Sequence, residues 1–252
     1  MKTMPGATVT TGDLQPEFLL AAFDARRAAV DIETTGLDWK ADTIGTVQVH
    51  VPDYGTTIVR KITHRPLRLI ELMTSARVQK VFHHAPFDLR FMAYHWDVRP
   101  LNVADTKLAS QILEPHADHK DHSLAPLVLR HFGVHLDKSV RFSDWLSEDL
   151  TRQQLQYAAQ DVQYLLPLLD KLTELAIDEG VADLIESSYA YLPVRIATDL
   201  RGCGDVFSYL SNGVEGRILL ARNPDPPLPP HRCPNRCGPA WTARTRASAL
   251  AP

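Results

Sequence analysis

One short stretch of the chain carries two acidic side chains at a spacing suited to metal binding. Asp31-Ile32-Glu33 follows the apolar run at 28–30 and reads as the end of a β-strand. Because side chains of a strand alternate between its faces, Asp31 and Glu33 point the same way, roughly 7 Å apart along the strand. Two such carboxylates repel each other unless a positive group lies between them, and a divalent metal ion is the usual solution. Alone the pattern is weak, since many surface strands carry it.

Two further stretches offer acids or a hydroxyl. Asp88 follows a short apolar strand at the start of a predicted helix, where the helix dipole favours an acid in any case. Tyr157 and Asp161 are spaced i, i+4, which puts both on one face of a predicted helix. A tyrosine packed in the core and a solvated aspartate would produce the same spacing. Each stretch is therefore weak in isolation, and their combination carries the argument.

The combination resembles a known family. The motifs are DIETTGL at 31–37, HHAPFD at 83–88 and YAAQD at 157–161. Their order and spacing are similar to those of the DEDD exonucleases, in the tyrosine-bearing subgroup. That subgroup includes ribonuclease D and the proofreading domain of family-A DNA polymerases.

Supporting stretches also resemble this family. VADTKLAS at 103–110 is similar to the family's helix after the second motif, and HSLAPLVLRHFGV at 122–134 and SDW at 143–145 are similar to the ribonuclease D branch. The resemblance extends from about residue 16 to about residue 209. The helical C-terminal HRDC domains typical of ribonuclease D have no counterpart in this sequence.

The resemblance implies a catalytic role for each of five residues. Asp31, Glu33, Asp88 and Asp161 match the acids that bind two divalent metal ions, Mg²⁺ or Mn²⁺. Tyr157 matches the tyrosine that orients or helps deprotonate the attacking water. Two divalent ions that straddle the scissile phosphate activate water on one side and stabilise the leaving oxygen on the other.

The resemblance also implies four residues that bind the substrate. Thr34, Gly36 and Leu37 match the stretch that grips the terminal nucleotide, with Leu37 stacking by its base and Gly36 allowing close backbone approach. His84 stands where many members of the family have asparagine. Because histidine titrates near neutrality, we expect the contact of His84 with the terminal phosphate or sugar to depend on pH.

The function implied is a two-metal 3′-5′ exonuclease that releases nucleoside 5′-monophosphates. The expected substrate is the single-stranded 3′ end of RNA, with DNA as an alternative, because discrimination depends on how the site treats the 2′-hydroxyl. A non-catalytic nucleic-acid-binding module is a further alternative. Loss of a metal-binding acid would favour that module, but all four acids and the tyrosine are present.

The predicted elements favour an α/β fold with a ribonuclease H-like mixed β-sheet flanked by helices. Strands over 26–35, 43–51 and 55–60 open the fold as three antiparallel strands, with turn chemistry at 52–54. The later elements are helix 66–75, strand 79–84, a helix from Pro86, strand 99–104, a helix from Asp105-Thr106, helix 123–132 and helix 151–179. Thr151 and Gln154 have capping-box spacing, and Pro167 should kink or split the last helix.

Composition divides the chain into three parts. We expect a flexible N-terminus over 1–15, an exonuclease domain over 16–209, and a disordered Pro/Arg-rich tail over 210–252. Residues 1–200 hold 20 basic and 27 acidic residues. An acidic domain does not bind nucleic acid through a broad basic face, so its contacts must be few and local, or its acids must hold metal.

Several classes of protein are excluded by composition. With 44% hydrophobic and 23% charged residues and no stretch of membrane-spanning length, the chain is typical of a soluble protein without membrane partners. The N-terminus lacks a secretory signal, and three cysteines form no disulfide framework, so we expect a cytoplasmic location. The sequence does not indicate an oligomeric state.

Two further patterns have more ordinary interpretations. His116, His119 and His122 repeat every three residues, but they lie among charged residues with no cysteine near, so we expect a surface loop and not a zinc site. Trp96 ends an amphipathic helix and is predicted to lie in the core. By resemblance, Trp145 is the better candidate for the substrate cleft.

Overall fold

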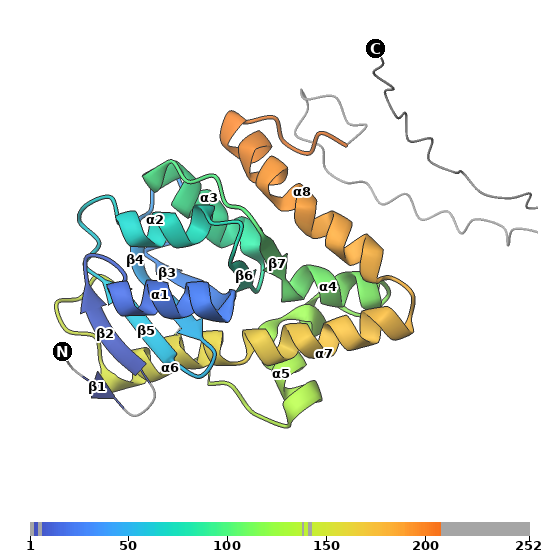
Figure 1. Ribbon diagram of the computed structural model, residues 1–252, viewed down its shortest axis with the longest axis horizontal. Helices are drawn as coiled ribbons and strands as arrows, with labels where there is room; N and C mark the ends of the chain where they lie inside the picture. The colour runs from blue at the N-terminus through green and yellow to red at the C-terminus, as the bar shows by residue number, and fades with distance from the viewer. Residues whose placement is uncertain (1–2, 5–6, 138, 141–142, 208–252) are drawn as a thin grey trace, which may run out of the picture. The chain divides into compact units, whose positions relative to one another are not determined.

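A mixed β-sheet forms the centre of residues 3–4, 7–137, 139–140 and 143–207, which are the residues that the computed structural model describes (Figure 1). In spatial order its strands are β1 (Thr3–Met4), β2 (Ala7–Thr11), β5 (Gly55–Arg60), β4 (Ile44–Val51), β3 (Arg27–Thr34), β6 (Gln79–Phe82) and β7 (Val103–Asp105). The antiparallel run β3-β4-β5 is as predicted, whereas β6, β7 and β2 pair in parallel with their neighbours β3, β6 and β5. The predicted ribonuclease H-like mixed sheet is confirmed.

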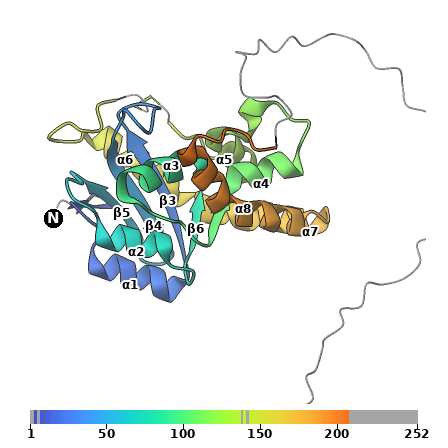
Figure 2. The ribbon, with the colours of Figure 1, turned by 90° about the horizontal axis from the view of Figure 1, so that it is seen from above.

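Helices cover both faces of the sheet. In chain order they are α1 (Pro16–Ala25), α2 (Leu67–Thr74), α3 (Ala85–Trp96), α4 (Thr106–Leu113), the short 3₁₀ helix η1 (His119–His122), α5 (Leu124–Phe132), α6 (Arg152–Gln163), α7 (Leu165–Asp178) and α8 (Ala182–Arg201). Viewed from above, α1 and α2 lie on one side of the strands and α6 lies on the other (Figure 2). Helix α8 packs against α3, α4 and β7.

Strand β3 shows how the side-chain alternation places the acids. Val30 and Ile32 are buried in the hydrophobic cluster beneath α1, α2 and α3, whereas Ala29 is buried in the cluster of α4, α5 and α7. Because side chains alternate, Asp31 and Glu33 continue the row of Ala29. They therefore face the side on which α6 crosses β3, β4 and β5.

The N-terminal segment is more ordered than we expected from its sequence. The prediction of a flexible 1–15 is wrong for the described residues from 7 onward, because β2 pairs in parallel with β5 over its whole length. Leu14 is fully buried in the main core. A short run of alanine, valine and threonine carries little local signal, and its pairing partner lies 49 residues further along the chain.

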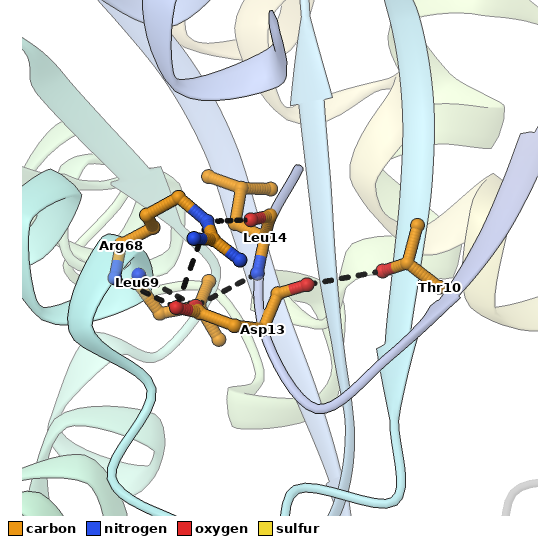
Figure 3. Close-up of polar contacts among 5 residues, drawn as sticks. All are labelled: Thr10, Asp13, Leu14, Arg68 and Leu69. Carbon is orange, nitrogen blue, oxygen red and sulfur yellow. Dashed lines mark hydrogen bonds and ion pairs between the residues drawn. The ribbon is translucent and has the colours of Figure 1, made fainter. Parts of the chain in front are cut away.

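The turn after β2 is fastened to α2 by Asp13 (Figure 3). Its carboxylate accepts hydrogen bonds from the backbone N–H groups of Arg68, at 2.9 Å, and Leu69, at 3.1 Å. Arg68 in turn donates from its guanidinium Nε to the carbonyl of Leu14. Asp13 thus caps the first turn of α2 from outside that helix, which satisfies N–H groups that the helix itself leaves unpaired.

The predicted helix 151–179 consists of two helices. α6 ends at Gln163 and α7 begins at Leu165, so Pro167 lies in the first turn of α7, where a missing N–H costs no hydrogen bond. The predicted capping box of Thr151 and Gln154 is confirmed.

Other boundaries differ from the sequence-based ones. The strand expected over 99–104 is confined to Val103–Asp105, and the preceding Asn102 is in the left-handed region with φ of 49°. Helices α1 and α8 were not predicted. The predicted tail over 210–252 lies outside the described residues. No helix among the described residues is both long and apolar enough to cross a membrane.

Candidate active site

One pocket, with a volume of about 650 Å³, lies at the carboxyl end of β3. It brings together all the residues assigned to the site from the sequence, which are Asp31, Glu33, Thr34, Gly36, Leu37, His84, Asp88, Tyr157 and Asp161. These residues come from β3 and the turn after it, from the start of α3, and from α6. The elements are distant in sequence and meet because β3 lies between β4 and β6, with α6 packed across it.

Three carboxylates form the centre of the pocket. Asp31, Glu33 and Asp161 each offer an oxygen, and these oxygens lie within 4.8 Å of one another. Within the described part of the chain, this is the one group of three or more acidic, histidine or cysteine side chains close enough to hold a metal ion. All-oxygen donor sets suit hard cations such as Mg²⁺ and Mn²⁺.

A β-bulge lies beside these carboxylates. The register of β3 against β4 shifts between Glu33 and Thr34, which leaves Gly45 of β4 as the extra residue. A Cβ atom on Gly45 would lie 2.7 Å from Cβ of Trp145. Only glycine therefore lets the segment before α6 approach β4 this closely.

Asp88 completes the acidic set from the side of α3. Its Oδ1 accepts a hydrogen bond from the backbone N–H of Ile32 at 3.1 Å, which ties α3 to β3 between the two acids of the first motif. The side chain is buried. Burial, and then the charge of Asp31, raise the pKa of Asp88 well above its usual range. Because ionisation of this buried carboxyl is unfavourable without a counter-charge, a neighbouring cation would stabilise its charged form.

Tyr157 lies one helical turn before Asp161 on α6, and both side chains are buried. Burial is the largest cause that raises the pKa of Tyr157, followed by the negative charges of Asp161 and Glu33. The hydroxyl is therefore protonated and acts as a hydrogen-bond donor toward negative or lone-pair groups in the pocket. The ring packs against Trp145 with a centroid distance of 6.0 Å.

Trp145 packs against Tyr157 from outside the pocket. It is only 2% exposed and does not line the pocket, so its predicted place in the substrate cleft is wrong. Its Cβ and backbone lie against Gly45, and its indole packs against the Tyr157 ring instead. Trp96 is buried, as predicted.

The turn after β3 is built around Asp42. Its Oδ2 accepts from the backbone N–H of Asp38 at 2.9 Å, and its Oδ1 accepts from the hydroxyl of Thr35 at 3.2 Å. A Cβ atom on Gly36 would lie 2.4 Å from Oδ2 of Asp42. Glycine thus leaves room for the Asp42 carboxylate packed against it. The close approach of a ligand to the backbone at Gly36 stays a prediction.

Thr34 and Leu37 lie at the two ends of this turn. The hydroxyl of Thr34 donates to the carbonyl of Gly36 at 2.6 Å, which closes the turn. Leu37 lines the pocket although it is 75% exposed. A large apolar side chain so exposed at the mouth of a pocket offers a surface for a flat ring such as a base.

His84 is held in an unusual backbone conformation by Asp105. His84 precedes α3 with φ of 76°, in the left-handed region. The carboxylate of Asp105 accepts hydrogen bonds from the backbone N–H groups of His84 and Ala85, both at 2.9 Å. The same carboxylate caps α4 by accepting from Lys107 at 2.9 Å and Leu108 at 3.2 Å. Asp105, predicted only to open a helix, thus joins the starts of α3 and α4.

His84 does not titrate near neutrality, contrary to our expectation. Although His84 as a whole is exposed, partial desolvation of its ring, and then the positive charges of Lys107, Arg90 and His119, lower the pKa of His84 to about 4. The ring is therefore neutral at physiological pH and can offer one donor and one acceptor.

The histidine-rich segment forms no metal site in the described residues. His116 and His119 are exposed, which agrees with the predicted surface loop. His122 differs because it is 3% exposed, with its Nδ1 2.8 Å from the hydroxyl of Ser110. It fastens η1 to α4 as a buried hydrogen-bonding residue.

Comparisons with known proteins agree with this geometry. Residues 7–177 match the family model described as 3′-5′ exonuclease. A ribonuclease D of Cronobacter turicensis is 31% identical over 179 residues, which cover 68% of this chain and 46% of that protein. Among solved structures, Brucella melitensis NrnC is 28% identical, with a TM-score of 0.76 over 82% of this chain and 100% of that one.

Two further structures of NrnC are similar to this chain. One has bound Mg²⁺, with a TM-score of 0.74 at 28% identity over 81% of this chain and 100% of that one. The other is bound to pGG, with a TM-score of 0.75 at 28% identity over 81% of this chain and 99% of that one. Escherichia coli RNase D, at 22% identity and a TM-score of 0.64 over 74% of this chain and 50% of that one, shares the fold.

The matches cover most of this chain but only part of the ribonuclease D relatives. The chain spans about half the length, or less, of the ribonuclease D proteins it matches, at 46% and 30% for two of them. The family model itself, however, covers most of the chain, from β2 to α7. Together with the acidic pocket, this match shows that the chain belongs to the 3′-5′ exonuclease family.

Proposed function

We propose that this protein is a two-metal-ion 3′-5′ exonuclease that releases nucleoside 5′-monophosphates from RNA 3′ ends. The observation that carries the proposal is the group formed by Asp31, Glu33 and Asp161, with Asp88 and Tyr157 lining the same pocket. Burial of several acids is energetically unfavourable, and a non-catalytic binding module would not require it.

The residues present fit divalent metal ions. Asp31, Glu33 and Asp161 would hold one ion, and Asp88, whose carboxyl feels the charge of Asp31, would help to hold a second. Either Mg²⁺ or Mn²⁺ suits these oxygen donors, and the similar NrnC structure contains Mg²⁺. When bound, such ions lower the pKa of water and stabilise negative charge on a leaving oxygen.

The protein groups around the acids have complementary roles in this proposal. The protonated hydroxyl of Tyr157 orients the attacking water by a hydrogen bond, and its raised pKa keeps the proton in place at neutral pH. Thr34 and Gly36 position the terminal nucleotide, with Leu37 stacking beside its base. Neutral His84 forms hydrogen bonds to the terminal phosphate or sugar without adding charge.

The substrate proposed is a short or single-stranded RNA end. The related NrnC structure bound to pGG supports recognition of a short substrate, because this chain matches nearly the whole of that protein. DNA is the alternative substrate, and the experiment below discriminates between the two.

The test uses matched RNA and DNA oligonucleotides labelled at the 3′ or the 5′ end. Each is incubated with the protein in Mg²⁺, in Mn²⁺ or in EDTA, beside an Asp31→Ala control. We expect a ladder that shortens from the 3′ end of RNA, requires metal and is absent in the control. A faster ladder on DNA would move the assignment to DNA, and no degradation of either polymer would reject the enzymatic function.

A further inference from the structure

Lys107 is a basic residue in an otherwise acidic pocket. It is the one lysine or arginine that lines the pocket within the described residues, beside four acids of the proposed metal site. It lies in the first turn of α4 and did not appear among the residues assigned from the sequence. We propose that Lys107 binds the phosphate group that lies one linkage to the 5′ side of the scissile phosphate.

The ammonium group of Lys107 is available for a ligand. Among the lysines in the part of the chain that the structure describes, it alone has no hydrogen bond, ion pair or ring contact through its ammonium. The others contact a carboxylate, a carbonyl or a ring, and they are Lys40, Lys61, Lys80, Lys120 and Lys171. Lys107 thus lines a pocket rich in carboxylates without an ion pair to any described one, which leaves its charge available to a ligand.

The backbone of Lys107 is fixed, so its side chain starts from a defined place. Its N–H donates to the buried carboxylate of Asp105 at 2.9 Å, and that carboxylate also holds the N–H of His84. The positive charge of Lys107 is close enough to His84 to lower the pKa of its ring. Lys107 and His84 therefore form one wall of the pocket, joined through Asp105.

The absence of carboxylate contacts also indicates which phosphate Lys107 would meet. This step rests on the proposed function, in which the scissile phosphate is held at the group of Asp31, Glu33 and Asp161. No carboxylate oxygen of a described residue lies within 4.0 Å of the Lys107 ammonium. A pocket-lining cation that is not paired with these acids can meet the next phosphate along the strand, where it would compensate a charge that the metal ions leave unbalanced.

The test combines a change in the protein with a change in one phosphate. The substrate is a hexaribonucleotide with either an ordinary phosphodiester or a neutral methylphosphonate at the linkage next to the scissile one. Both versions carry a 2′-O-methyl group on the nucleotide that precedes this linkage, because a free 2′-hydroxyl would cleave the methylphosphonate. kcat/KM for release of the first nucleotide is measured for the wild type, Lys107→Met, Lys107→Arg and the surface control Lys171→Met.

We expect Lys107→Met to lower kcat/KM about tenfold or more on the ordinary substrate, because a charge-assisted hydrogen bond to the phosphate is lost. On the methylphosphonate substrate it should have an effect of less than about twofold, because the phosphate charge is already absent. Lys107→Arg should recover most of the rate, and Lys171→Met should match the wild type.

Several outcomes would overturn the inference. They are an equal loss on both substrates, no loss on either, or a coupling that appears only when the methylphosphonate is placed one linkage further from the 3′ end. Failure of the proposed function is distinct, because the wild-type protein would then release no nucleotide from the ordinary substrate in Mg²⁺ or Mn²⁺.

Discussion

The burial of Asp88 predicts that this residue lowers the stability of the metal-free protein. The carboxyl is 3% exposed, and its pKa is raised by burial and by the charge of Asp31. In Asp88→Asn the amide oxygen can still accept the hydrogen bond from Ile32, whereas the buried negative charge is gone. We therefore expect the variant to be more stable without metal and inactive with it.

The pH dependence of this effect follows from the direction of the pKa shift. Because the folded state holds the proton of Asp88 more tightly than the unfolded state, the wild-type protein loses stability as pH rises above the ordinary pKa of 3.8. Asparagine has no such loss. The free energy of unfolding of Asp88→Asn should thus exceed that of the wild type by about 1–3 kcal/mol at pH 7, and this advantage should vanish under acidic conditions.

Thermal unfolding in EDTA at pH 5 and pH 8 measures the effect. A rise in Tm of about 2–4 °C for each kcal/mol is expected for a domain of this size, with the larger rise at pH 8. Addition of Mg²⁺ should stabilise the wild type more than the variant and so reduce the difference. Asp53→Asn is the matched control, because Asp53 is exposed with φ of 58°, which asparagine tolerates. A lower Tm for Asp88→Asn in EDTA at pH 8 would refute the reasoning.

Three further predictions concern the rest of the pocket. His84→Asn should change the rate by the same factor throughout pH 5.5–8, because the pKa of His84 is lowered to about 4 and both side chains are neutral in this range; a ratio that varies with pH in parallel rate profiles would contradict this. Tyr157→Phe should lower kcat about 10²-fold or more with KM and Tm nearly unchanged, since only the hydroxyl is lost; a normal kcat would remove the tyrosine from the mechanism. Gly36→Ala should lower kcat/KM by about 10–100-fold, because its Cβ would lie 2.4 Å from the carboxylate of Asp42 and displace the turn. Wild-type kinetics for this variant would show that the turn adapts without cost.

Local patterns in the sequence were sufficient for several parts of this structure. The period of two in a strand put Asp31 and Glu33 on one face, and the capping box of Thr151 and Gln154 marked the start of α6. Pro167 marked the division between α6 and α7. These features depend on backbone geometry within a few residues, so the sequence carries them directly.

Features that rest on contacts between distant segments were missed or misread. Strand β2 is stabilised by β5 and by the Asp13 cap on α2, neither of which has a local signal. Trp145 was expected in the cleft, but the close approach of its segment to Gly45 puts it behind Tyr157.

The residue types of the site could be predicted from the sequence, whereas their pKa values could not. The motifs supplied the types of the acids and the tyrosine, because chemistry requires those groups at that spacing. The low pKa of His84 and the raised pKa of Asp88 arise from burial and from charges on other elements. Desolvation and Coulomb interactions depend on distances in space, and folding alone sets those distances.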